Sequence, residues 1–557
     1  MISGPLRGDL LAGLTVAAYL VPQVMAYATV AGLPPVAGLW AALAPLALYA
    51  LLGSSSRLSV GPESTTALMT AVAVAPLAAG DPGRYAVLSA ALAIVAGLLC
   101  LVAWLLRLGF VADLLSRPIL VGYLTGVAII MILGQLGKLT GVPMDGYDLI
   151  GFARDLPGLH LPTLLMAFAV LAFLFLLQWK LPRLPGPLLA VLLATACVTL
   201  FGLDDLGIKV VGQIPSGLPT PALPAPGDLP ALLLPALGLL LVGYSDNVLT
   251  ARSFAARHRQ EVDANRELLA LGAANLGAGV LQGFPVSSSG SRTALADAAG
   301  ARSQRYSLVA LAGVVAVLLF AGPLLADFPT AALGAIVVYA AIRLIDLPAF
   351  RRLASFRRSE LLLALAAAAG VLVFDILYGI LLAVALSVAE MLHRIARPHD
   401  AVQGLVPGLA GMHDIDDYPS AKTVPGLVVY RYDSPLFFAN AQDFRRRALA
   451  ALSPGTSWFV LNVEANVEVD ITALDALESL RAELDRQGVV FAMARVKQDL
   501  RTALDAYGLT ASIGEERLFP TLPTAVDAYL NRPADTPQDG AATTPGTPAP
   551  GSGPTSE

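Results

Sequence analysis

Long apolar runs separated by short polar stretches occupy the chain from residue 9 to residue 396. Each long run approaches the roughly 20 residues that cross a bilayer core of about 30 Å. Polar faces do not alternate with apolar ones inside these runs, as they would in the helices of a soluble core. The pattern predicts a polytopic α-helical membrane protein. We place its fourteen segments at residues 9–30, 36–53, 63–78, 84–107, 111–137, 161–179, 187–202, 229–254, 265–283, 291–300, 304–325, 329–345, 358–374 and 376–396.

Two of these segments are conspicuously short, and both follow an interruption rich in Gly, Pro and Ser. RLSVGP precedes segment 63–78, and FPVSSSGS leads into segment 291–300. Each is the third of its set of seven, and the two contain related residues, STTAL at 64–68 and SRTAL at 291–295. Chance similarity in a Leu- and Ala-rich chain is one explanation. Interrupted segments at matching places in two halves favour the other, a transporter whose binding site lies at the interruptions.

The chemistry at the interruptions suits an anion. A half-helix that begins within the membrane presents unpaired backbone N–H groups and the positive end of its dipole. Hydroxyl side chains there can cap the helix or donate to a ligand oxygen, and an arginine adds a permanent charge with a donor fork that matches oxyanions. We therefore predict an anion site where the two short segments begin. The residues are Pro62, Glu63, Ser64 and Thr65 in the first half and Ser289, Gly290, Ser291 and Arg292 in the second.

Alternatives stay open for these residues. The hydroxyls can serve only as caps of interrupted helices, and Arg292 can be a structural cation paired with an acid, most obviously Asp246 in LLLVGYSDNVLTARSF. In the first segment, Pro22 interrupts the helical hydrogen bonds and Gln23 follows it directly. Gln23 is either a donor to the ligand or the partner of the carbonyl that the proline leaves free.

Composition agrees with a membrane protein and argues against several other classes. Charged residues make up 14% of the chain and the mean hydropathy is +0.69, whereas about a quarter of the residues of soluble proteins are charged. Cys100 and Cys197 lie in apolar runs, which argues against a disulfide framework. The histidines lack metal-ligand spacing, and the glycine cluster GAANLGAGV does not follow a strand. We expect no enzyme, no cofactor, no metal site and no nucleic-acid partner.

The basic residues predict the orientation of the segments. If the N-terminus is cytoplasmic, the stretches on that side include LPRLPGP, ARSFAARHRQEVDANRE, GARSQR and RLIDLPAFRRLASFRRSE, whereas the opposite side carries few Lys or Arg. This is a positive-inside bias, and an even number of segments returns the C-terminus to the cytoplasm. No cleavage site follows residues 1–8, so the first segment itself inserts. We expect a multi-pass protein embedded in the lipid of the inner (cytoplasmic) cell membrane.

The character of the chain changes after residues 1–396, the predicted transmembrane transport domain. Residues 397–422 are polar and predict a linker. GLVVYRYD, WFVLNVEA and VVFAMARV then have the pattern of short buried strands, with amphipathic helical patterns between and after them. Strands that alternate with helices predict a small α/β domain at residues 423–530. Residues 531–557, rich in Pro, Thr, Gly and Ser, predict a disordered tail.

Three long motifs resemble those of one family. They are LRGDLLAGLTVAAYLVPQVMAYATVAGLPPVAGLW, YALLGSSSRLSVGPESTTALM and NRELLALGAANLGAGVLQGFPVSSSGSRTALADAAG. They resemble the SulP (sulfate permease) family of anion transporters, and the C-terminal α/β part, with NVEVDITALDALESL, resembles its cytoplasmic STAS domain. The resemblance runs from about residue 6 to about residue 530 and is strongest to actinobacterial members named sulfate transporters.

The resemblance implies a fold and a site. It implies two inverted repeats of seven segments, with segments 1–4 and 8–11 as a mobile core and segments 5–7 and 12–14 as a gate. It also implies an elevator-type movement of the core past the gate, and a homodimer formed partly through the STAS domain. The resemblance further implies a single anion site between the starts of segments 3 and 10, facing segments 1 and 8. The matching residues here are Gln23, Tyr27, Pro62, Glu63, Ser291 and Arg292, with Asp246 in place of the more usual Glu.

The resemblance favours sulfate as the substrate, and we expect uptake coupled to H⁺. Glu63 either carries the coupling proton, because a carboxylate beside an anion repels it unless protonated, or caps the dipole of its own helix. One alternative is Na⁺-coupled bicarbonate transport, with Asp246, Thr250 and Ser289 around the sodium ion. Dicarboxylate transport and an exchanger or channel on the same scaffold are further alternatives.

The STAS resemblance also bears on regulation. Related regulatory domains are phosphorylated on a serine that directly follows an aspartate. Here Ile471 follows Asp470, and the hydroxyl residue Thr472 is displaced by one position. We therefore expect this domain to serve packing and dimerisation rather than phosphoregulation.

Overall fold

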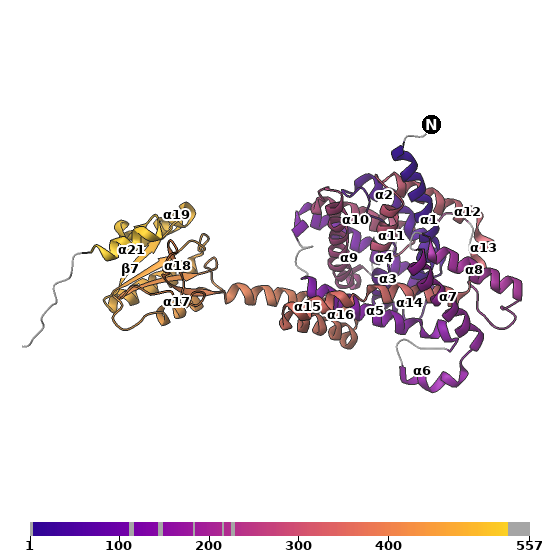
Figure 1. Cartoon of the computed structure of the whole chain (residues 1–557). Coiled ribbons are helices and arrows are strands. Elements are labelled where there is room, and N and C mark those ends of the chain that lie inside the picture. The colour runs from indigo at the N-terminus through magenta and orange to yellow at the C-terminus, as the bar shows by residue number, and fades with distance from the viewer. Residues whose placement is uncertain are drawn as a thin grey trace, which may run out of the picture. The chain divides into compact units, whose positions relative to one another are not determined.

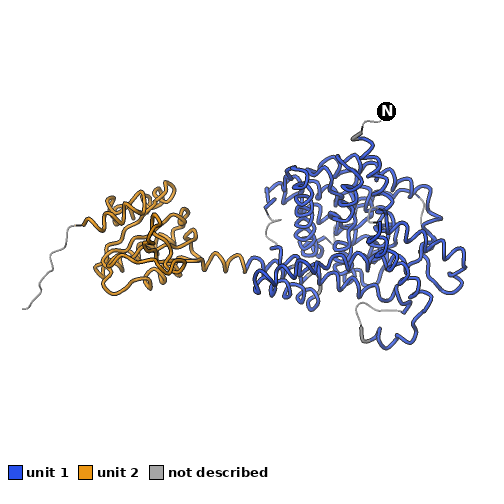
Figure 2. The backbone as a smooth tube through the Cα atoms, in the orientation of Figure 1, with its two compact units in different colours: residues 1–389 blue, residues 390–557 orange. Residues whose placement is uncertain are grey.

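The computed structural model describes residues 4–110, 116–142, 149–181, 184–213, 217–223 and 229–532. The chain divides into two compact units, residues 1–389 and 390–557 (Figure 2). The first unit is helical and the second is a mixed α/β unit (Figure 1). Of the predicted disordered tail, residues 533–557 lie outside the described residues.

The helices of the first unit follow the apolar runs of the sequence, and every predicted segment coincides with a helix. The short helices α6 and α15 lie outside the predicted segments. The helices are α1 (Gly4–Val30), α2 (Val36–Leu52), α3 (Ser64–Ala78), α4 (Pro82–Leu105), α5 (Arg117–Thr140), α6 (Leu149–Asp155), α7 (Leu161–Lys180), α8 (Gly186–Phe201), α9 (Leu229–Arg257), α10 (Ala264–Val280), α11 (Gly290–Ala298), α12 (Arg305–Phe320), α13 (Gly322–Ala326), α14 (Thr330–Leu344), α15 (Leu347–Phe356) and α16 (Arg358–Ala396).

The last helix, α16, contains both of the predicted segments 358–374 and 376–396. A Cβ at Gly379 would lie 2.7 Å from the Cα of Val371, and one at Gly370 would lie 2.8 Å from Cδ2 of Leu382. Eight residues of a straight helix rise about 12 Å, so these approaches are impossible without a bend. The chain therefore reverses direction within α16, and the two predicted segments lie side by side.

Small residues let helices from the two halves of the sequence approach closely. α4 packs against α10, and a Cβ at Gly97 would lie 2.8 Å from the carbonyl oxygen of Gly272. In the reverse direction, a Cβ at Gly272 would lie 3.0 Å from the carbonyl oxygen of Gly97. Such close backbone contacts are typical of membrane helices, where packing replaces the hydrophobic drive of water.

A short β pair joins the two interruptions. Strand β1 (Val60–Gly61) pairs antiparallel with β2 (Ser287–Ser288), with Val60 opposite Ser288 and Gly61 opposite Ser287. Extended backbone within a membrane protein must find hydrogen-bond partners inside the protein, and each interruption supplies the other's. α3 and α11 follow directly after these strands, so the pairing fixes the starts of both half-helices next to each other in the middle of the helical unit (Figure 1).

The second unit has a six-stranded sheet with the order β4-β3-β5-β6-β7-β8. β5 to β8 are parallel, β3 pairs antiparallel with β5, and β4 pairs antiparallel with β3 at the edge of the sheet. Alternate residues of β5 face two apolar layers, because Val428 and Tyr430 pack with α17 and α18 whereas Leu427 and Val429 pack with α21. The elements are β3 (Asp400–Leu405), β4 (Met412–Asp414), β5 (Leu427–Tyr432), α17 (Ala441–Ala450), β6 (Trp458–Asn462), α18 (Ile471–Arg486), β7 (Val490–Ala494), α19 (Gln498–Tyr507), α20 (Leu509–Ile513), β8 (Leu518–Phe519) and α21 (Leu522–Leu530).

The three strands that the sequence predicts, at β5, β6 and β7, form the middle of this sheet. Residues 397–422, which the sequence predicts as a linker, contain β3 and β4 instead. Both strands mix polar with apolar residues, and β4 has only three residues, so they lack the apolar run that marks a buried strand.

Candidate functional site

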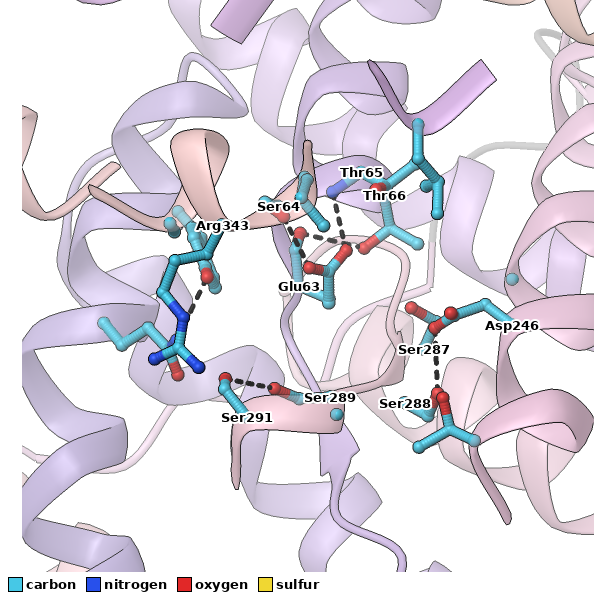
Figure 3. Close-up of a pocket in the computed structure, with 18 of the residues that line it drawn as sticks. Glu63, Ser64, Thr65, Thr66, Asp246, Ser287, Ser288, Ser289, Ser291 and Arg343 are labelled. Carbon is cyan, nitrogen blue, oxygen red and sulfur yellow. Dashed lines mark hydrogen bonds between the residues drawn. The ribbon is translucent and has the colours of Figure 1, made fainter. Parts of the chain in front are cut away.

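A cavity of about 290 Å³ lies where α3 and α11 begin (Figure 3). α1 and α9 add further walls, and α14 closes one side with its last turn. Most of the residues predicted for the anion site line this cavity. They are Gln23, Tyr27, Glu63, Ser64, Thr65, Asp246, Ser289, Gly290 and Ser291.

The start of α3 is capped by Glu63. Its carboxylate accepts a hydrogen bond of 2.7 Å from the backbone N–H of Thr65 and one from the hydroxyl of Ser64, and the Thr66 hydroxyl donates to the Glu63 carbonyl oxygen at 3.2 Å. The geometry thus provides the capping role for Glu63 that the sequence leaves open. The carboxylate also accepts the hydrogen bond of the Thr65 amide, which would otherwise be free to donate into the cavity.

The start of α11 is more open. The N-cap residue Ser289 accepts from the Arg292 amide at 3.5 Å, and the Ser289 and Ser291 hydroxyls lie 3.2 Å apart. The backbone amides of Gly290 and Ser291 have no acceptor among the described residues, as expected for the first turn of a helix. A Cβ at Gly290 would meet no atom within 4 Å. Two free amides and two hydroxyls therefore border open space.

α1 contributes Gln23 and Tyr27, whose side chains are hydrogen-bonded to each other. Gln23 donates from Nε2 to the Tyr27 hydroxyl at 3.0 Å, and its Oε1 accepts from Nη1 of Arg292 at 3.2 Å. Both Gln23 and Tyr27 are buried and line the cavity. The Arg292 contact therefore orients Gln23 with its amide nitrogen toward Tyr27.

Arg292 lies behind the cavity wall and does not line it, contrary to the prediction that it is a direct ligand. The side chain is fully buried; Nη1 donates to the carbonyl oxygen of Pro62 at 2.8 Å and Nε donates to the Ser59 hydroxyl at 3.3 Å. Pro62 is likewise absent from the lining and takes part through this carbonyl. Arg292 thus ties α11 to the interruption before α3, and its charge lies close to the starts of both half-helices.

Asp246 is not the ion-pair partner of Arg292 that the sequence suggests. It lies on α9, lines the cavity and accepts a hydrogen bond of 3.0 Å from the hydroxyl of Ser288. Thr250, one turn further along α9, lines the cavity as well. Over the described ranges, no group of three or more His, Cys, Asp or Glu side chains is placed to hold a metal ion.

Sequence reasoning missed the wall formed by α14. Tyr339 and Arg343 line the cavity, together with Tyr19 of α1. Arg343 donates from Nη1 to Oε1 of Gln178 at 3.2 Å and to the Tyr339 hydroxyl at 3.1 Å, and no acidic side chain in the described part of the chain pairs with it. Figure 3 shows Arg343 and Asp246 on opposite sides of Glu63. In the sequence, Arg343 merely opens a basic stretch, which indicates a loop facing the cytoplasm.

Comparison with known proteins identifies the family to which the chain belongs. The model of the sulfate permease family matches residues 6–367, and that of the STAS domain matches residues 418–525. The chain belongs to the sulfate permease family. The resemblance predicted from the motifs is therefore confirmed, as is the STAS domain, and a member of this transporter family is not an enzyme.

Relatives and solved structures agree with this assignment. The "Probable sulfate transporter" of Mycobacterium tuberculosis (strain H37Rv) is 63% identical over 536 residues, which cover 95% of this chain and 96% of the relative. "Sulfate transporter 4.1, chloroplastic" of Arabidopsis thaliana is 30% identical and covers 94% of this chain and 80% of the relative. The transmembrane domain of the bicarbonate transporter BicA from a cyanobacterium superposes with a TM-score of 0.62 at 27% identity and covers 68% of this chain and 98% of that one.

A solved structure of a more distant protein shares the complete fold. Murine Slc26a9, an anion transporter in the inward-facing state, superposes with a TM-score of 0.87 at 23% identity and covers 95% of this chain and 92% of that one. At this identity the likeness shows the fold alone. The predicted polytopic helical fold with a C-terminal α/β STAS domain is therefore confirmed.

In this sulfate permease member, the STAS residue Asp470 has a structural task. It is the N-cap of α18, where one carboxylate oxygen accepts from the Ala473 amide at 2.8 Å and the other from the Phe438 amide at 2.8 Å. Asp470 therefore joins the start of α18 to the loop after β5.

Proposed function

We propose that this chain is a secondary active transporter that takes up sulfate together with H⁺. The observation that carries the proposal is the cavity at which two half-helices begin, with several hydroxyls and with amides at Gly290 and Ser291 that have no acceptor in the described part of the chain. A helix start combines N–H donors with the positive end of the dipole, and two of them favour an anion more than one does. The relatives named sulfate transporters at 63% identity support sulfate as the anion.

The charges around the cavity explain why a proton would accompany the anion. Glu63 and Asp246 both line it. The guanidinium group of Arg343 lines it as well, and that of Arg292 lies behind its wall. A dianion that enters beside two carboxylates is repelled unless one of them is neutral. Protonation of Glu63 would remove one negative charge and weaken its hold on the Thr65 amide, which would then be free to donate to the anion.

The two ends of α14 differ, which supports alternating access in an inward-facing arrangement. Arg343 and Leu344, at the end of α14, line the cavity, and the basic residues of α15 follow. At the opposite end of α14, Gly334 lies next to Lys138, whose ammonium donates to the Thr29 carbonyl oxygen at 3.4 Å. We assign the end with Arg343 to the cytoplasm, together with both termini, since basic residues favour that side.

The same arrangement supports an elevator mechanism. α1, α3, α9 and α11, which supply the half-helices and the donors, belong to the predicted core, whereas α14 belongs to the predicted gate. A site between two bodies changes its exposure when one slides past the other. We further propose that two chains associate as a homodimer, with the STAS domains taking part.

Uptake of labelled anions into proteoliposomes tests this function. We expect sulfate uptake that rises with an inward proton gradient and exceeds uptake of bicarbonate and fumarate. Collapsing the gradient with a protonophore is the control, because it leaves the liposomes and the anion unchanged. Flat sulfate uptake with robust bicarbonate or fumarate uptake would overturn the substrate and leave the anion site in place.

A second candidate function is Na⁺-coupled bicarbonate transport. The position of Asp246 favours it, because the carboxylate lines the cavity beside Thr250 and receives a hydrogen bond from Ser288. Arg292 and Arg343 near the same cavity oppose a cation. Replacing external Na⁺ by choline decides between the two, since it abolishes bicarbonate uptake under this candidate and leaves proton-driven sulfate uptake unchanged.

A further inference from the structure

A second cavity, of about 320 Å³, adjoins the first. It lies between α7, the start of α8, α11 and α14, and its size is at the lower end of the roughly 300–1,000 Å³ of small-molecule sites. The two cavities share five lining residues, so they meet directly. The shared residues are Tyr19, Ser291, Ala294, Tyr339 and Arg343.

The passage between the cavities, which we call the neck, is polar and positively charged. Tyr19, Ser291 and Tyr339 supply hydroxyls, and Arg343 supplies a guanidinium. Among the described residues, only Nη1 of Arg343 donates hydrogen bonds, and both of its acceptors, on Gln178 and Tyr339, are neutral. The remaining N–H groups of a permanent cation are therefore available to a ligand at the neck.

Beyond the neck, the second cavity is apolar, and we call it the leucine lobe. Leu174 of α7 and Leu295 of α11 are buried in its wall. Leu177, Leu181 and Leu184 continue this wall, and Gln178 is its one polar side chain outside the neck among the described lining residues. An inorganic oxyanion has nothing to gain from such a surface, whereas an alkyl or aryl group gains by leaving water.

We propose that the joined cavities bind organic monoanions, namely alkyl or aryl sulfonates and carboxylates. The anionic head group lies at the neck between Arg343 and Ser291, and the apolar part fills the leucine lobe. Inorganic sulfate uses the first cavity alone, so these ligands compete with it. The inference rests on the proposed function only in requiring that the first cavity accepts an oxyanion.

A series of alkanesulfonates tests the two parts separately. Calorimetric titration of the purified full-length protein with methane-, propane- and pentanesulfonate should show affinity rising about three- to fourfold per added methylene, since each buried CH₂ contributes about 0.8 kcal/mol. Ala298→Leu fills the lobe from the end of α11 without touching the first cavity. It should abolish the dependence on chain length and keep methanesulfonate binding.

Two further variants serve as controls. Ala196→Leu adds the same side chain to an exposed position of α8 and should leave the series unchanged. Arg343→Gln should weaken every member by a similar factor and preserve the gain per methylene.

If affinity rises equally per methylene in the wild type and in Ala298→Leu, the apolar chain does not bind in the leucine lobe. The same conclusion follows if affinity does not rise with chain length in the wild type. If the wild type binds neither sulfate nor methanesulfonate, the anion site itself is overturned, and with it the proposed function. Sulfate binding without any gain per methylene would overturn only this inference.

Discussion

At the scale of single residues, Glu63 is placed for two roles, as the cap of α3 and as the carrier of the coupling proton. Its carboxylate caps α3 through the Thr65 amide and also faces the cavity. Capping by a carboxylate at a helix start is worth about 0.3–1 kcal/mol, so its loss alone does not unfold the protein. A role in coupling would instead change how transport depends on protons.

Glu63→Gln is therefore predicted to fold normally and to transport sulfate at a rate that no longer responds to the proton gradient. The amide is permanently neutral, so it mimics the protonated carboxyl without titrating. Uptake is measured over a series of external pH values at constant internal pH. If uptake by the variant still rises with an imposed inward proton gradient, Glu63 does not carry the coupling proton.

Arg292 and Ser291 are neighbours with different predicted effects. Arg292→Ala removes a buried guanidinium that bonds Pro62, Gln23 and Ser59. Each hydrogen bond to a charged group contributes about 1.5–3 kcal/mol, so the variant should unfold at a clearly lower temperature as well as lose transport. Ser291→Ala loses one cavity hydroxyl and should lower sulfate affinity with little change in the unfolding temperature. An Arg292→Ala protein with wild-type thermal stability would contradict the structural role.

At the scale of elements, the paired interruptions show what the sequence predicts and what it does not. Hydroxyl-rich stretches before two short apolar segments predict half-helix starts, and the cavity lies there. The β1–β2 pairing is not predictable, because it depends on the register between two two-residue strands that lie far apart in the chain. For the same reason the side of α11 that holds Arg292 is not readable from the sequence, and Arg292 faces the first interruption rather than the cavity.

The positions of Arg343 and of strands β3 and β4 likewise depend on packing that the sequence does not reveal. A basic residue at the end of an apolar helix indicates the cytoplasmic side, and only the packing of α14 against the core places this one at the cavity. In the STAS domain, β3 and β4 mix polar with apolar residues and do not stand out from a linker. β3 forms because β5 offers it an edge, and β4 then pairs with β3.

The approach of α4 and α10 yields a prediction for stability. Gly97→Val places a branched side chain against the backbone of Gly272 and forces the helices apart. Overpacking of this kind costs about 1–3 kcal/mol, so the detergent-solubilised variant should melt at a lower temperature than wild type. Gly158→Val is the matched control, because a Cβ there would meet no atom within 4 Å. Equal melting temperatures for both variants would show that α4 and α10 tolerate separation.

Just before β3, the STAS domain contains a contact to the end of β4 that depends on pH. His399 and Asp414 lie 2.7 Å apart, and the hydrogen bond to Asp414 raises the pKa of His399. A histidine whose pKa is raised by folding stabilises the domain fully below its unfolded pKa of about 6.5, and the gain is lost as pH rises through the folded value. The His399 side chain is 59% exposed and thus screened by water, so the gain is below about 1 kcal/mol.

Denaturant unfolding of the STAS unit, which has its own apolar core, is therefore predicted to show slightly higher stability at pH 6 than at pH 8. His399→Gln should remove this difference. A variant with the same slope against pH as wild type would mean that another group causes it.

At the scale of the whole molecule, two halves of the sequence build one site. α3 and α11 start side by side because β1 and β2 pair, and α4 and α10 hold the halves together through small residues. Neither half contains the cavity alone, since Glu63 and Ser291 come from different halves. The account therefore requires both half-helix starts to face the bound anion.

Binding of labelled sulfate to the Gly290→Leu variant tests this requirement most directly. Gly290 begins α11, lines the cavity and has open space where a side chain would lie, so leucine fits without a clash and fills the position of the anion. The account predicts an unchanged melting temperature and at least a tenfold loss of sulfate affinity, about 1.4 kcal/mol, with Gly158→Val as control. Sulfate binding equal to that of wild type in a folded Gly290→Leu protein would contradict an anion site between the two half-helices.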